Sequence, residues 1–422
     1  MGKTMSEKLL AMAAGQKEVA AGDIVWVNVD KAMMDDILGP RVQIAEKLEE
    51  LNCEIWDPNK VMVISDHYTP PASIQQAEIV KFTRDWAKAH GICDYYEFVG
   101  PCHQNMVENG HILPGTLVVG TDSHTCMGGA FGAFATGIGS TEMLSVLVTG
   151  QIWLKVPQTI RINCEGQLPR HVYAKDIALE LTRRIGHAGA TYQAIEYHGD
   201  TIAALSMDER MAITNMAVEC GAKTGLMQPD EKAVQYLRQR GFEVPEISWI
   251  YSDSGAVFSR EETIHAEALQ PLVACPHAVD NVKPAAALSD VGIDQVYIGS
   301  CTGGRLSDLR IAAGLLKGKR IHEGVRLLVS PASDKIWRAA SEEGILQILA
   351  GAGATILEPT CGICVGVHSG LLAAGEHCIS TTNRNFMGRM GSKDADIYLS
   401  SAATAAASAL TGRITDPREL DV

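Results

Sequence analysis

The stretch GATILEPTCGIC, residues 353–364, contains a short apolar run that is followed closely by two cysteines. Other stretches of the chain repeat this form, in which a β-prone run ends in small, polar or reactive residues. They are NKVMVISDH (59–67), GTLVVGTDSH (115–124), DQVYIGSC (294–301), GVRLLVSPAS (324–333) and HCISTTNRN (377–385). Segments with helical periodicity lie between them, and this alternation predicts parallel α/β sheets. Because ligands bind at the carboxyl ends of parallel strands, we expect the reactive residues to form one site.

The length and charge of the chain limit its domain count and its partners. A chain of 422 residues predicts two or three domains. Changes in sequence texture predict three α/β domains at residues 1–155, 156–283 and 284–422. A formal net charge of -14 argues against nucleic-acid binding and against attraction to anionic membranes. The apolar runs are too short to span a bilayer and the N-terminus does not resemble a signal peptide, so we expect a cytoplasmic protein.

The eleven cysteines do not indicate a disulfide framework, because their number is odd and the chain has no secretory signal. Cys361 and Cys364 have the spacing of a redox pair, or of two zinc ligands that His368 and His377 would complete. Cys301, at another strand end, opens a third possibility. Three thiolates from two strand ends can bind three irons of a 4Fe–4S cluster and leave the fourth iron open. An open iron is a Lewis acid that can bind a hydroxyl group.

A resemblance to a known family favours the third possibility. The motifs GSCTGGR, CGIC and NRNFMGR, with SDH, CHQ, TDSHT, GAFATGIGSTEM and EYHG upstream, resemble the aconitase superfamily in order and spacing over almost the whole chain. The closest resemblance is to the large subunits of the isopropylmalate dehydratase group, which includes homoaconitases and dimethylmalate or methylmalate dehydratases. It implies three domains with mainly parallel sheets around a central iron–sulfur cluster. It also implies that Cys301, Cys361 and Cys364 are the ligands of one 4Fe–4S cluster.

The resemblance implies an activity as well. Enzymes of this group are hydro-lyases that dehydrate or isomerise a 2-alkylmalate. We expect the conversion of 2-isopropylmalate to 3-isopropylmalate, in leucine biosynthesis. The alternatives are a homoaconitase and a 2,3-dimethylmalate or methylmalate dehydratase. In one motif the chain departs from the family, because Gly303 stands where an asparagine is usual; we expect this to alter the stability of the cluster.

Dehydration of a hydroxy acid needs a proton donor for the leaving hydroxyl, and pairing with a carboxylate raises the pKa of a histidine. The residues that match the family's acid–base groups are Asp66, His67, His103, Asp122, His124 and Glu196. Arg384 and Arg389 match its substrate-binding arginines, since a guanidinium pairs bidentately with a carboxylate. Ser123 and Asn383 are expected to contact the substrate or the region of the cluster.

In the family, the carbon-acid base is a serine on a swivelling fourth domain, and we expect no counterpart of that domain in residues 1–422. We therefore expect a small subunit that carries the swivel domain, in a heterodimer or heterotetramer that acts on a dicarboxylate or tricarboxylate. Two other classes remain open at this point. One is an RNA-binding regulatory relative, and the other is a zinc-stabilised binding module.

Overall fold

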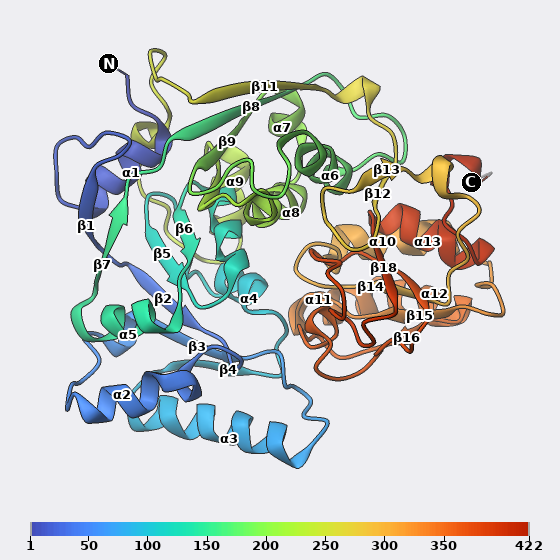
Figure 1. Cartoon of the computed structure of the whole chain (residues 1–422), viewed down its shortest axis with the longest axis horizontal. Helices are drawn as coiled ribbons and strands as arrows, with labels where there is room; N and C mark the ends of the chain where they lie inside the picture. The colour runs from blue at the N-terminus through green and yellow to red at the C-terminus, as the bar shows by residue number, and fades with distance from the viewer. Residues whose placement is uncertain (1, 421–422) are drawn as a thin grey trace.

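The computed structural model describes residues 2–420 (Figure 1). Its first sheet has five parallel strands in the order β4-β3-β2-β5-β6. The strands are β2 (Lys31–Met34), β3 (Val61–Ser65), β4 (Asp94–Glu97), β5 (Leu117–Gly120) and β6 (Phe134–Gly137). The helices of this part are α1 (Met5–Ala13), α2 (Ala45–Glu50), α3 (Ile74–Ala89), α4 (Cys102–Glu108) and α5 (Ser140–Thr149). Every residue of β3 and of β5 is buried, which explains their continuous apolar runs.

The second sheet has four parallel strands in the order β10-β9-β8-β11. They are β8 (Thr159–Glu165), β9 (Ala194–His198), β10 (Thr224–Met227) and β11 (Arg260–His265). Its helices are α6 (Ala174–Ile185), α7 (Asp200–Ala204), α8 (Met207–Asn215) and α9 (Glu231–Arg238). An antiparallel ribbon of β1 (Ile24–Asn28) and β7 (Gln151–Lys155) leads from the first part into this one.

The third sheet has seven strands in the order β13-β12-β18-β17-β14-β15-β16. They are β12 (Leu272–Ala274), β13 (Val282–Pro284), β14 (Gln295–Ile298), β15 (Arg326–Val329), β16 (Thr355–Ile356), β17 (His377–Ser380) and β18 (Asp396–Leu399). Its helices are α10 (Leu306–Leu316), α11 (Asp334–Glu342), α12 (Ile345–Ala352) and α13 (Ala402–Thr411). The strands from β18 to β16 are parallel, whereas β12 and β13 pair antiparallel at one edge.

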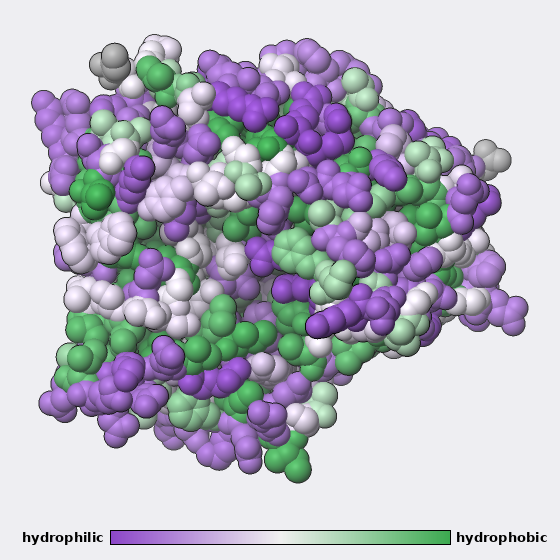
Figure 2. Space-filling model, viewed as in Figure 1, coloured by the Kyte–Doolittle hydropathy of each residue, from purple (hydrophilic) through white to green (hydrophobic). Residues whose placement is uncertain are grey.

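The fold confirms the predicted α/β architecture with mainly parallel sheets. Buried clusters also join the three parts. One packs Met33 and Met62 of the first sheet against Met211 of α8 and Leu237 of α9, and another joins Leu179 of α6 to Tyr297 of the third sheet. Figure 1 shows the third sheet beside the other two, with α4, α8 and α6 toward the side where they meet. Figure 2 shows a face on which hydrophilic residues predominate, with hydrophobic residues gathered around α5. Within residues 2–420, no helix has both the length and the apolar character needed to cross a membrane.

Candidate active site

Carboxyl ends of strands in the first and third sheets converge on one place, and hydrogen bonds connect all three parts of the chain there. The backbone N–H of Cys361 donates to the carbonyl of Asp66 at 2.8 Å, which joins the third part to the first. His124 Nε2 lies 2.7 Å from Glu219 Oε1, which joins the first part to the second. Arg384 donates through Nε to the same Glu219 oxygen at 2.9 Å, which joins the third part to the second.

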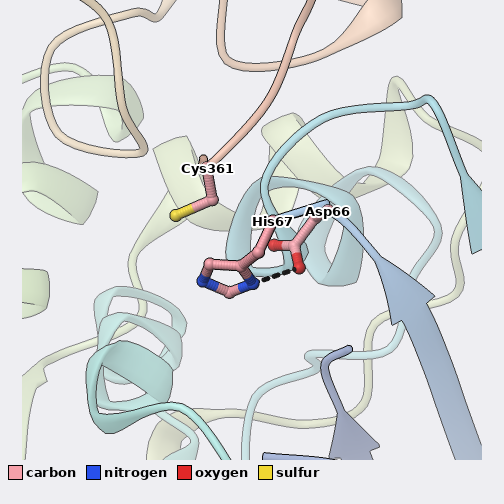
Figure 3. A group of neighbouring side chains, drawn as sticks. All are labelled: Asp66, His67 and Cys361. Carbon is pink, nitrogen blue, oxygen red and sulfur yellow. Dashed lines mark ion pairs between the residues drawn. The ribbon is translucent and has the colours of Figure 1, made fainter. Parts of the chain in front are cut away.

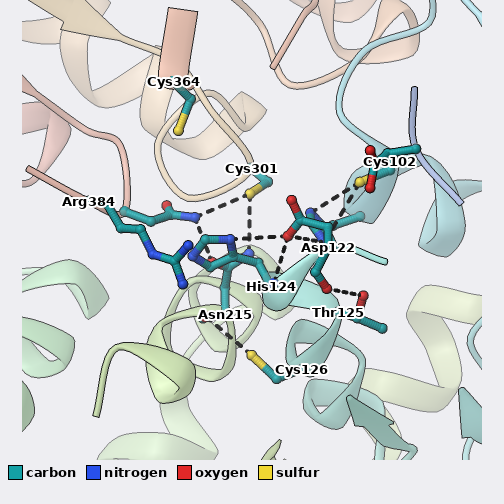
Figure 4. A network of polar contacts seen from close by, with 12 residues as sticks. Cys102, Asp122, His124, Thr125, Cys126, Asn215, Cys301, Cys364 and Arg384 are labelled. Carbon is teal, nitrogen blue, oxygen red and sulfur yellow. Dashed lines mark hydrogen bonds and ion pairs between the residues drawn. The ribbon is translucent and has the colours of Figure 1, made fainter. Parts of the chain in front are cut away.

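The three predicted cluster cysteines are buried, free thiols. Cys301 follows β14, while Cys361 and Cys364 follow β16. Two amide groups are directed at the Cys301 sulfur: Nδ2 of Asn215 lies at 3.2 Å and Nδ2 of Asn383 at 3.7 Å. In Figure 4, Cys301 and Cys364 approach from one side the space that Asp122, His124 and Arg384 approach from the other.

The protonation of the three thiols is interdependent. The pKa of Cys364 lies well below its ordinary value, chiefly because its sulfur accepts a hydrogen bond from Cys361, whose own pKa is raised by that bond and by burial. Burial raises the pKa of Cys301, but the hydrogen bond and charge of His103 outweigh this effect and lower it to about 7. Thiolates are the form that metals bind, so this donor set is suited to a cation.

Two glycines bring the backbone close to neighbouring groups at the cysteines. A Cβ on Gly362 would lie 1.9 Å from His368 Nε2, so only glycine fits between Cys361 and Cys364. A Cβ on Gly303 would lie 2.2 Å from the Cβ of Thr381, whose hydroxyl is held by Gly299. An asparagine at this position would therefore clash, and the amides that donate to the Cys301 sulfur come instead from Asn215 and Asn383.

The chemistry of the donor set fits an iron–sulfur cluster. Three buried thiols with amide N–H groups directed at sulfur are the surroundings that such clusters use. The zinc alternative does not have the ligands it needs, because His377 lies at the opposite end of β17 from the site. Its Nδ1 is 3.0 Å from the carbonyl oxygen of Gly292. His368 is close, but its Nε2 contacts the hydroxyl of Thr360 at 3.1 Å.

His67 is held by carboxylates on the first sheet. Its Nδ1 lies 2.8 Å from Asp66 Oδ1 and 3.2 Å from Asp36 Oδ1. Burial lowers the pKa of His67, but the charges and hydrogen bonds of these two carboxylates raise it well above its ordinary value. Figure 3 shows the imidazole beside Asp66, with the sulfur of Cys361 directed toward the same space. A charged imidazole therefore faces the cysteines from the first part.

Asp122 connects the other two histidines. Its Oδ1 lies 3.3 Å from His103 Nε2 and 3.2 Å from His124 Nδ1. Burial lowers the pKa of His103, but Asp122 and the thiol of Cys301 outweigh it and raise this pKa to about 10. Burial and the charge of Arg384 lower the pKa of His124, but Asp122 and Glu219 outweigh them and raise it. The His103 ring is thus protonated near neutral pH, and the same surroundings favour the protonated form of His124.

The two arginines of NRNFMGR, Arg384 and Arg389, are each held by a hydrogen bond from Nε. Arg384 is held through Nε by Glu219, and Arg389 donates through Nε to the carbonyl of Cys364 at 2.9 Å. Within the described part of the chain, no group accepts a hydrogen bond from the terminal nitrogens of either side chain. Each guanidinium therefore has an unused pair of N–H donors, which matches the two oxygens of a carboxylate.

The structure also shows which predicted residues are outside this network. Glu196 is fully buried, but its carboxylate contacts His198 at 2.8 Å, the hydroxyl of Ser252 at 2.6 Å and the backbone N–H of Met5 at 3.4 Å. Glu196 therefore does not contact His67, His103 or His124. Glu219 is the glutamate that contacts His124. Ser123 lines a neighbouring cavity of about 440 Å³.

Sequence reasoning missed several residues of the site: Asp36, Lys175, Asn215 and Glu219. A signal for the last two exists in NMAVEC (215–220), where a charged residue and an amide interrupt an apolar run four positions apart. Lys175 is buried in the first turn of α6. Burial lowers its pKa to about 8, against the opposing influence of Cys301 and Cys364.

Known proteins share the sequence over almost the whole chain. The sequence profile of the aconitase family (aconitate hydratase) matches residues 7–286 and 277–412. The 3-isopropylmalate dehydratase large subunit 1 of Methanopyrus kandleri is 48% identical over 420 residues, which cover 99% of each chain. A probable 3-isopropylmalate dehydratase large subunit of Methanothermobacter thermautotrophicus is 48% identical over 422 residues and 100% of each chain. A probable methanogen homoaconitase large subunit of Methanosarcina mazei is 48% identical over 395 residues, 93% of this chain and 99% of that protein.

The fold and the site together define an enzyme of the hydro-lyase class whose family uses an iron–sulfur cluster. The chain belongs to the aconitase family. Both statements confirm what the cysteine, histidine and arginine motifs predicted.

Proposed function

We propose that this chain is the cluster-bearing large subunit of a 3-isopropylmalate dehydratase, which converts 2-isopropylmalate to 3-isopropylmalate in leucine biosynthesis. The observation that carries the proposal is the convergence of Cys301, Cys361 and Cys364 beside protonated histidines and two arginines with unused N–H pairs. The full-length identity to large subunits with this activity in their names supports it.

We assign the three thiolates to one 4Fe–4S cluster per chain. The iron that lacks a protein thiolate would supply a Lewis acid for the substrate's hydroxyl and carboxylate. The amides of Asn215 and Asn383 would hold the Cys301 sulfur in place, as they do in the structure. Burial of all three thiols would exclude water from this side of the site.

The protonated histidines supply the proton that the leaving hydroxyl needs. His103 and His124 share Asp122, which orients both rings and stabilises their charged forms. We assign the proton donor to this group, with His67, held by Asp66 and Asp36, on the other side of the thiols. A positioned acid of this kind contributes about 10²–10⁴-fold to the rate.

The arginines bind the carboxylates of the substrate in this proposal. Arg384 and Arg389 are each anchored at Nε, so their terminal N–H pairs have fixed directions. A dicarboxylate such as an alkylmalate provides one oxygen pair for each of them. Ser123 and Asn383 complete the polar surface that the substrate meets.

The proposed partner is a small subunit with the swivel domain. The relatives of equal length are named large subunits, and the family resemblance implies a serine base on the separate domain. We propose that this partner supplies the base that removes the carbon-bound proton, and that it contacts the alkyl group. The large subunit alone should then bind a cluster but turn over substrate negligibly.

The test is to reconstitute the chain anaerobically and to assay hydration of isopropylmaleate by its loss of ultraviolet absorbance. Addition of a 3-isopropylmalate dehydratase small subunit should restore activity and saturate near one partner per chain. About four irons per chain, with matching sulfide, should accompany this activity. Full turnover without a partner would contradict the two-subunit proposal.

A second candidate is the large subunit of a homoaconitase. This candidate is supported by the 48% identity to a probable methanogen homoaconitase large subunit, which equals the identity to the 3-isopropylmalate dehydratase large subunit of Methanopyrus kandleri. Assays with homoaconitate and with isopropylmaleate, each with its own small subunit, distinguish the two substrates.

A further inference from the structure

A buried cation lies behind the loops that carry the cysteines. Lys175 is 4% exposed, although it belongs to the second part of the chain. Its Nζ donates to the carbonyl oxygens of Thr382 at 2.7 Å and Thr381 at 3.2 Å, and to the hydroxyl of Thr302 at 3.3 Å. All three acceptors lie in loops that follow strands β14 and β17 of the third sheet. Helix α6 thus places an ammonium group against the back of the site.

This ammonium group lacks a carboxylate partner within the described residues, since its hydrogen bonds go to two carbonyls and a hydroxyl. Burying a charge is costly unless an opposite charge compensates it. The negative groups that act on Lys175 are Cys301 and Cys364 first, then Asp308 and Glu219. The hydrogen bond to Thr302, the residue after Cys301, places the ammonium group beside the loop that carries this sulfur.

A chain of hydrogen bonds also connects Lys175 to a ligand sulfur. Because the ammonium donates to the Thr302 oxygen, the hydroxyl proton of Thr302 is available to a second group. Two acceptors share that proton: the carbonyl oxygen of Thr381, at 2.9 Å, and the side-chain oxygen of Asn383, which the hydroxyl also contacts. With its oxygen held in this way, Asn383 directs its N–H₂ group at the Cys301 sulfur and at the side-chain oxygen of Asn215, 2.9 Å away.

We propose that Lys175 is a positioning residue for the iron–sulfur cluster: its buried charge balances the thiolates, and its contact with Thr302 orients the Asn383 amide toward Cys301. The inference rests on the proposed function, because it requires the cluster. A nearby positive charge favours the more negative, reduced form of a cluster and strengthens its retention. The resting potential of the cluster and the rate of iron loss should both depend on Lys175.

The experiment compares Lys175→Met, which removes the charge and keeps the length, with Lys175→Arg, which keeps the charge. Lys232→Met is the control, because Lys232 likewise makes three hydrogen bonds, in its case to the backbone carbonyls of Ala203, Ala204 and Leu205, away from the cysteines. Each protein is reconstituted anaerobically, its cluster is titrated electrochemically with an electron paramagnetic resonance readout, and iron release in air is timed.

Lys175→Met should show a more negative midpoint potential and iron release that is severalfold faster. Lys175→Arg and Lys232→Met should behave as the unmodified chain in both measurements. Unchanged potential and iron release in Lys175→Met would overturn the inference, and so would equal damage in Lys175→Arg, which would indicate a space-filling role. If Lys175→Met does not fold, Lys175→Gln carries the same expectations. Failure of the unmodified chain to bind a cluster would count against the proposed function instead.

Discussion

The first sheet and the loops after the third sheet contribute to one site, but they satisfy their polar groups differently. On the first sheet, Asp66, Asp122 and their histidines neutralise one another within the chain. Around Cys301, in contrast, the surrounding groups are the amides of Asn215 and Asn383 and the buried ammonium of Lys175. Donors and a positive charge of this kind favour a thiolate that binds metal. The acid–base half is preorganised by the protein alone, whereas the cysteine half is complete only with its cluster. Substitutions should therefore fail in different ways in the two halves.

The largest effect is expected in the cysteine half. Cys364→Ser should lose the cluster and all activity, because two thiolates cannot hold the remaining irons of the cubane. Iron and sulfide analysis after anaerobic reconstitution measures this loss. Cys378→Ser is the control, since Cys378 is a buried thiol within β17 whose sulfur contacts the carbonyl of Ile379. The comparison breaks down if Cys378→Ser loses the cluster and Cys364→Ser keeps it.

The next largest effect is expected at Arg384, which we propose binds a carboxylate of the substrate. Arg384→Lys keeps the charge but loses the fork of N–H groups, so kcat/KM should fall by tens to thousands of fold, equivalent to about 2–5 kcal/mol. The cluster content should be unchanged, which separates this variant from Cys364→Ser. Arg310→Lys, at an exposed pair with Glu343, is the control and should retain normal kinetics. Normal kinetics for Arg384→Lys would remove its role in carboxylate binding.

The two glutamates give a sharper test of where the acid–base half ends. Glu219→Gln should lower kcat about 100-fold, because the uncharged amide no longer stabilises protonated His124 or anchors Arg384. Glu196→Gln should cost severalfold at most, since its partners are His198 and Ser252. Steady-state kinetics with measured iron content compares them. A larger loss in Glu196→Gln would return the catalytic assignment to Glu196.

The smallest effect is a displacement of the pH profile. Asp122 raises the pKa of His103, so the protonated ring persists until the pH rises through about 10. In Asp122→Asn the carboxylate charge that raises the pKa of His103 is removed, while burial still lowers this pKa. His103 should therefore lose its proton at a lower pH. The alkaline limb of kcat/KM should move down by about one pH unit or more, equivalent to about 1.4 kcal/mol. An unmoved limb would mean that the His103 proton does not limit the reaction.

Much of the site could be predicted from sequence because its residues follow strands. Asp66, Asp122, Cys301 and Cys361 each come shortly after an apolar run, and parallel pairing brings such ends to one edge. Glu219 and Lys175 could not be predicted in this way, since neither follows a strand. Glu196 stands within β9, where its carboxylate contacts His198 and Ser252, so its predicted catalytic role stays a prediction.

The sequence by itself determined the parallel α/β class, the family and the three cysteines, because these depend on local periodicity and on short, ordered motifs. Only the tertiary structure decided which buried charges meet. His124 and Glu219 are 95 residues apart, and Lys175 and Thr382 are 207 apart. The same structure excludes a side chain at Gly303, where Thr381 occupies the space. Contacts of this range depend on how three sheets pack, and a buried charge is stable only where that packing supplies its partner.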